Sequence, residues 1–139
     1  MSRTPAHADE VAALARARNP RVTSATVKTL PARMAGVNLL VNCTACGQTG
    51  LRSAGDTLAV TLEPYSALAD VSPTGVARAA TDVDTLRACL ASNLDGIERN
   101  TRASLSRLME LPASALLCDI FYAPAETALR RQARMTGRP

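Results

Sequence analysis

Residues 83–108 read VDTLRACLASNLDGIERNTRASLSRL, and this stretch decides the fold. Apolar residues recur in it in steps of three and four, with Thr101 as the one polar member of a series made of Val83, Leu86, Leu90, Leu94, Ile97, Thr101, Leu105 and Leu108. Eleven residues in three turns is close to the natural pitch of an α-helix, so the stripe stays on one face without supercoiling. The spacing predicts one long amphipathic helix, roughly 39 Å at 1.5 Å per residue, with its apolar side covered.

The apolar side of this helix could be covered in two ways, which are compatible with each other. The helix either lies across the sheet of its own chain or pairs with the same helix of a second chain about a two-fold axis, in a homodimer or a larger oligomer. The predicted interface consists of the apolar residues Leu86, Leu90, Leu94, Ile97, Leu105 and Leu108.

Flanking residues predict where helices begin and end. Thr81 and Asp84 have the spacing of a capping box, and Pro112 stops the long helix and starts a second one. The apolar face of that second helix is formed by Leu116, Leu117, Ile120 and Phe121. A last short helix is expected over residues 125–135, with Glu126 paired to Arg130, and the long helix carries the pairs Asp95–Arg99 and Glu98–Arg102.

The first half of the chain favours strands. Residues 9–18 suit a short helix, since acids come first and arginines last. Residues 21–30, 37–42 and 57–62 are rich in strand-forming side chains, residues 67–71 are a possible fourth strand, and a long hairpin loop spans residues 43–56. The sequence therefore predicts an α+β fold: a short N-terminal helix, a small antiparallel sheet of about three to four strands, then one long and one or two shorter C-terminal helices.

Length and composition suit one folded domain over residues 1–139, with 1–7 and 136–139 flexible. The hydrophobic fraction is 47%, yet the chain has one Phe, two Tyr and no Trp, so its core must be aliphatic. No stretch is apolar enough to span a membrane, and the N-terminus lacks the apolar core of a secretory signal. A cytoplasmic location with reduced thiols is expected, or a virion if the protein is viral.

Arginine supplies nearly all of the positive charge in a chain of net charge +4. Two basic clusters are candidates for binding nucleic acid: Arg16, Arg18, Arg21, Lys28 and Arg33 form the front cluster, and Arg130, Arg131, Arg134 and Arg138 form the back cluster. Guanidinium groups bind phosphates without any particular motif. The alternatives are codon usage in a GC-rich genome and a merely solvated basic surface.

The segment Cys43-Thr-Ala-Cys46-Gly47 has the spacing of half a zinc site. Cys89 and Cys118, the other possible ligands, are expected to be buried core residues. A disulfide between Cys43 and Cys46, or two ordinary loop cysteines, are the alternatives. Zinc at this loop would make the chain an adaptor or regulator that contacts another protein, and no other cofactor is expected.

Catalytic residues are not expected. The chain has a single histidine, His7, near its N-terminus, and no nucleophile, metalloprotease or nucleotide-binding motif. Asp82 and Asp84 are explained by helix capping, and Asp119 by a paired carboxylate in the core. The sequence indicates a protein that is not an enzyme.

The order of strands followed by two C-terminal helices resembles the layout of small RNA-phage coat proteins, and more loosely that of small dimeric nucleoid-associated proteins. The opening helix and the unusual length of residues 83–108 depart from the coat-protein pattern. The resemblance implies a self-associating structural protein that binds nucleic acid, as in a capsid, and it transfers no site residues.

Overall fold

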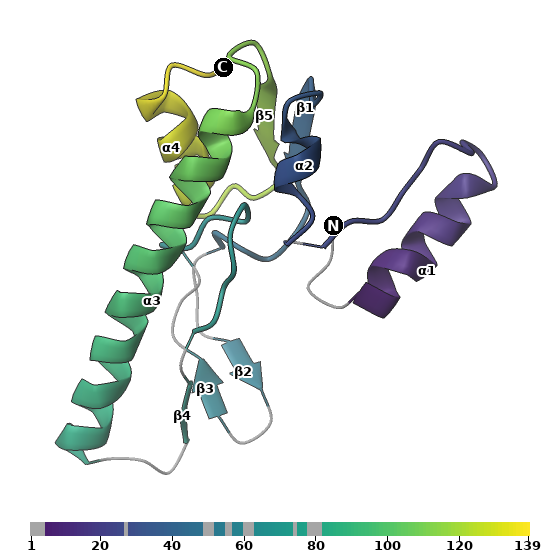
Figure 1. Cartoon of the computed structure of the whole chain (residues 1–139). Coiled ribbons are helices and arrows are strands. Elements are labelled where there is room, and N and C mark those ends of the chain that lie inside the picture. Colours follow the sequence, from purple (N-terminus) through teal and green to yellow (C-terminus); the bar gives the residue numbers. More distant parts are fainter. Residues whose placement is uncertain are drawn as a thin grey trace.

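The computed structural model describes residues 5–26, 28–48, 52–54, 57–59, 63–73, 75–77 and 82–139. The elements in chain order are α1 (Pro5–Arg16), α2 (Pro31–Met34), β1 (Leu39–Asn42), β2 (Arg52–Ala54), β3 (Thr57–Ala59), β4 (Gly75–Ala77), α3 (Val83–Glu110), β5 (Leu116–Asp119) and α4 (Ala128–Met135). The class is mixed α and β, as predicted. Helix α3 is the longest element; the other elements are arranged along it, except α1, which lies off to one side (Figure 1).

Helix α3 confirms the long helix, with a different cap. The carboxylate of Asp82 accepts a hydrogen bond from the Thr85 amide at 2.7 Å, and Thr81 lies outside the described residues. Leu111 is extended, and its amide still donates to Leu108 at the last turn. Because the next residue is Pro112, which restricts the residue before it to extended conformations, the helix ends here.

The main core lies at the C-terminal end of α3. Its fully buried members come from α2, α3, α4 and the segments between them: Met34, Leu68, Leu108, Leu111, Ala115 and Leu129. As expected from the composition, these side chains are aliphatic. Strands β1 and β5 add Leu40 and Leu117 from one side of this core.

The predicted second helix after Pro112 is wrong, because residues 116–119 form strand β5. This strand pairs in parallel with β1, in a register that sets Leu40 beside Leu117 and Asn42 beside Asp119. The prediction that β1 belongs to an antiparallel sheet is therefore also wrong. Leu117 and Asp119 point toward the core side, whereas Leu116 and Cys118 are exposed. Cys118 is thus not the buried core residue that its neighbours suggested.

Strands β2, β3 and β4 form a separate three-stranded antiparallel sheet. This sheet lies beside the N-terminal half of α3 (Figure 1). Since β1 pairs with β5 rather than with β3, and residues 52–54 of the predicted loop form β2, the predicted hairpin is wrong. Residues 67–71 form turns and irregular backbone rather than a strand.

Residues 21–26 and 28–30 are also irregular, so the predicted first strand is wrong. Local contacts compete with sheet pairing here: Arg16 donates to the Val22 carbonyl, and Ser24 donates to the Asp9 carboxylate. The segment therefore packs back on α1, and both lie to one side of the body (Figure 1).

The C-terminal helix is confirmed as α4, with Thr127 as its N-cap. Glu126 pairs with Arg134 at 2.9 Å and with Arg131 at 3.6 Å, rather than with Arg130.

Residues 136–139, expected to be flexible, pack on the body. Arg138 is buried and donates to the Leu111 carbonyl, and the Pro139 carbonyl accepts from the Leu117 amide. No helix in the described part of the chain is long and apolar enough to cross a membrane.

Candidate functional site

Helix α3 does not pack through its apolar stripe. The residues it buries are mostly small or polar: Cys89, Asn93, Gly96, Asn100, Ser104 and Leu108. At 100° per residue, the centre of this buried face lies about 80° around the axis from the centre of the stripe. Over the first half of the helix, the prediction that the rest of the fold covers the stripe is therefore wrong.

Four members of the stripe stay largely exposed, and we refer to them as the apolar edge: Val83 at 58%, Leu86 at 46%, Leu90 at 57% and Leu94 at 57%. The stripe is covered only toward the C-terminal end, where Ile97 and Leu105 are half-buried and Leu108 is fully buried in its own core. Of the predicted interface residues, Leu86, Leu90 and Leu94 are thus open to a partner, whereas Leu108 is not.

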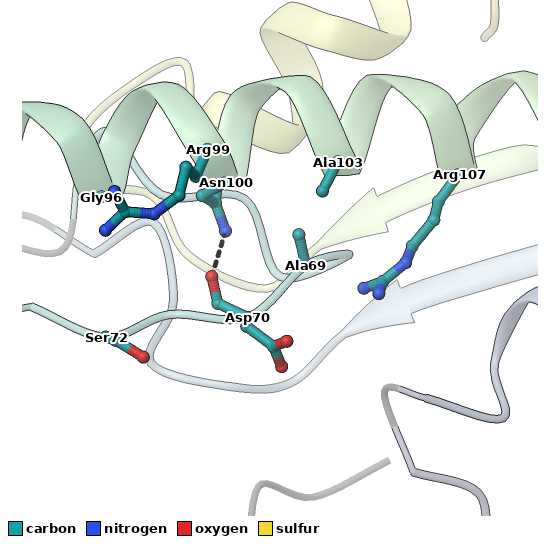
Figure 2. Close-up of a pocket in the computed structure, with 8 residues that line it drawn as sticks. All are labelled: Ala69, Asp70, Ser72, Gly96, Arg99, Asn100, Ala103 and Arg107. Atoms are coloured by element: carbon teal, nitrogen blue, oxygen red, sulfur yellow. Dashed lines mark hydrogen bonds between the residues drawn. The ribbon is translucent and has the colours of Figure 1, made fainter.

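A cavity of about 260 Å³ lies between the middle of α3 and residues 69–72. Five of its lining residues share one face of the helix, Gly96, Arg99, Asn100, Ala103 and Arg107, and the facing segment contributes Ala69, Asp70 and Ser72. Arg99 and Arg107 lie on either side of Asn100, whose amide reaches the Asp70 carbonyl (Figure 2). Small side chains on both walls leave the space open.

The two predicted basic clusters lie far apart. The front cluster is on α1, the segment that follows it and α2, and the back cluster is on α4 and the segment after it, across the body (Figure 1). Arg138 is buried, so it is not part of a surface that could bind nucleic acid. All front-cluster side chains are exposed, and among the described residues none of them forms an ion pair. In the back cluster, Arg131 and Arg134 share Glu126, and Arg130 donates to the Ala125 carbonyl.

The cysteines of the predicted zinc half-site differ in environment. Cys43 is exposed, whereas Cys46 is buried and its thiol contacts the Tyr65 carbonyl at 3.5 Å. All four cysteines are free thiols. Within the described ranges, no group of three or more His, Cys, Asp or Glu side chains could hold a metal ion. Zinc binding stays a prediction, and metal analysis of protein purified without chelator tests it.

The acidic residues have structural partners. Asp82 is the cap of α3, which lowers the pKa of its carboxyl through the hydrogen bond from the Thr85 amide. Asp119 accepts hydrogen bonds from Asn42 and Thr127 and from the Phe121 amide. It is held by neutral donors rather than by a cation. His7 lies on α1, exposed beside Glu10.

Comparison with known proteins gives no relative: no family model, no curated protein and no solved structure matches this chain.

The site residues that sequence reasoning missed are Arg99, Asn100 and Arg107. Arg99 was expected to pair with Asp95, but the structure has no such ion pair, whereas Glu98 and Arg102 do pair, at 2.7 Å. The available signal was the spacing of residues 96, 99, 100, 103 and 107, which share one helix face.

Proposed function

We propose that this chain is a non-enzymatic, self-associating structural protein that binds a polyanion, nucleic acid, through arginines. The observation that carries the proposal is the apolar edge of α3. A run of large aliphatic side chains, each about half exposed on a rigid helix, is typical of a surface that another protein covers.

The spacing of the edge favours a second copy of the same chain as that protein. The four residues of the edge and the half-buried Ile97 that follows them are placed symmetrically about Leu90, in steps of 3, 4, 4 and 3. An antiparallel pair of helices with its two-fold axis at Leu90 therefore sets Leu86 opposite Leu94 and Val83 opposite Ile97. A two-fold interface requires this self-complementarity, whereas a foreign partner does not.

The front cluster is the better candidate for the polyanion. Its guanidinium and ammonium groups are exposed and have no acidic partner among the described residues. The back cluster is partly neutralised by Glu126. Binding of this kind is governed by the phosphate backbone, so it depends on salt and little on sequence.

Light scattering of the Leu90→Asp variant tests the interface. The wild type is expected to have the mass of a dimer, and the variant that of a monomer, because the substitution sets two carboxylates together in an apolar contact. Ala88→Asp is the matched control, since residue 88 is exposed on the opposite side of the same helix turn. Leu90 is exposed in the single chain, so the variant should keep its fold by circular dichroism. A monomeric wild type at high concentration, or a dimeric Leu90→Asp, contradicts the proposed interface.

A further inference from the structure

The cavity beside α3 has a fixed frame. The Asn100 side chain accepts a hydrogen bond from the Ser66 amide at 2.8 Å and donates to the carbonyls of Ser66 and Asp70 at 3.0 and 2.9 Å. These bonds use both hydrogens of its amide group and one oxygen. The segment that forms the far wall is therefore held at a set distance from the helix, and the cavity exists before any ligand arrives.

Positive charge dominates the lining. Arg99 and Arg107 form no ion pair with the residues that the structure describes. Nη1 of Arg107 donates one hydrogen bond to the Leu68 carbonyl. The one acid of the lining, Asp70, is exposed. A guanidinium has five N–H donors in a planar fork, so each arginine keeps donors for an oxygen-rich anion.

A buried hydroxyl stands behind the Arg99 end of the cavity. Tyr65 is only 1% exposed, and its hydroxyl has no hydrogen-bond partner within the described residues. This oxygen lies 2.8 Å from the position that a Cβ would take at Gly96, a residue of the cavity wall. A buried hydroxyl without a partner is unusual in a folded protein. The Gly96 wall of the cavity therefore lies next to an unused hydrogen-bond donor.

We propose that this cavity binds the phosphate group of a small phosphorylated molecule. Arg99 and Arg107 hold the phosphate oxygens, and Asp70 accepts a hydrogen bond from a hydroxyl of the same molecule. The volume is below the range of pockets for drug-sized ligands, so the molecule has few carbon atoms. This site is separate from the front cluster and from the apolar edge, and it does not depend on the proposed self-association.

Calorimetric titration with inorganic phosphate and with glycerol phosphate, at constant ionic strength in chloride, tests the site. Saturable binding is expected for both, tighter for glycerol phosphate because it adds hydroxyls for Asp70. The double variant Arg99→Gln/Arg107→Gln should weaken binding at least about tenfold, the effect of losing one charge-assisted contact. Arg102→Gln is the matched control, since Arg102 is exposed and paired with Glu98 on another side of α3.

A second readout uses the two tyrosines, because the chain has no tryptophan. Phosphate should change the near-ultraviolet spectrum of the wild type, and Tyr65→Phe should remove this change. Binding by Leu90→Asp separates this site from the interface, since a monomer should bind phosphate as the wild type does. Absence of saturable binding, or equal binding by the double arginine variant, overturns the proposal.

Discussion

A Cβ atom added at Gly96 would lie 2.8 Å from the hydroxyl oxygen of Tyr65. Real side chains do not approach so closely, so the bare backbone of α3 at this point is what lets the tyrosine ring fit beneath the helix. Tyr65 in turn closes a small cluster with Cys46, packed against Ile97 and Val71. The glycine, which lowers the intrinsic stability of a helix, is thus explained by close packing.

Gly96→Ala should destabilise the protein although alanine is the better helix former. The clash with a buried, rigid ring costs about 1–3 kcal/mol, which exceeds the gain of up to about 1 kcal/mol in helix propensity. Tyr65→Phe removes the oxygen, and the next atom of the ring is 3.8 Å away. The double variant should therefore be more stable than Gly96→Ala alone, as measured by urea denaturation. Additive effects of the two substitutions would show that the contact is not the cause.

The existence and bounds of α3 could be predicted from the sequence, but its orientation could not. Periodicity shows which residues share a face, and the largest apolar side chains then suggest which face is buried. Here the buried face includes Gly96, whose small size suits close contact with Tyr65, and Asn100, whose amide group bonds to Ser66 and Asp70. That contact depends on residues some 30 positions away, which local pattern does not reveal.

Strand β5 shows a second limit of predicting structure from the sequence. A run of apolar residues after a proline suits a short helix and a buried strand equally well. Residues 116–119 form a strand because they pair with β1, which lies about 77 residues earlier in the chain. Strand β1 also provides the side-chain amide of Asn42 as a donor to Asp119. The cavity could not be predicted for a related reason: the sequence suggests Asp95 as the partner of Arg99 and gives no sign of the wall that faces Arg99 and Arg107.

Asp119→Ala should lower the free energy of unfolding by about 1–3 kcal/mol. The substitution leaves the hydroxyl of the buried Thr127 without the acceptor it has at 2.8 Å, and it removes the carboxylate that accepts from the side-chain amide of Asn42. Asp119→Asn keeps a side-chain carbonyl in the same place and should lose less. Cys118→Ala, on the exposed face of the same strand, is the control and should change stability by less than about 0.5 kcal/mol. Equal losses in all three variants would contradict this role of Asp119.

Alkaline pH should weaken the fold through Tyr65. Burial raises the pKa of its phenol above the ordinary value of 10.0, although the charge of Arg99 opposes the shift. A raised pKa means that the folded state keeps the proton that the unfolded state loses. The contribution to stability is complete below pH 10.0 and is lost as the pH rises through the folded value. Denaturation midpoints across this range should fall less steeply for Tyr65→Phe than for the wild type.

A cysteine at position 90 should cross-link two copies of the chain. In the proposed two-fold pair, residue 90 is the one position of the edge that faces itself, so Leu90→Cys brings two thiols together. The background carries Cys43→Ser and Cys118→Ser, because these two native thiols are exposed. Mild oxidation should give a covalent dimer on a non-reducing gel, and Ala88→Cys should not. A dimer formed equally by both variants would indicate random collision, and no dimer from Leu90→Cys would place the axis elsewhere.

Salt dependence should distinguish the front cluster from the back cluster. The logarithm of the affinity for duplex DNA falls with the logarithm of the salt concentration, with a slope of about −0.9 for each phosphate neutralised. Arg18→Gln and Arg21→Gln remove exposed guanidinium groups that have no acidic partner among the described residues, so each should weaken binding and make the slope shallower by about 1. Arg134→Gln removes a guanidinium already bound to Glu126 at 2.9 Å and should leave the slope unchanged. Fluorescence anisotropy with a labelled duplex over a salt series measures all three. A shallower slope for Arg134→Gln, with no change for the other two variants, would place the polyanion-binding site on α4.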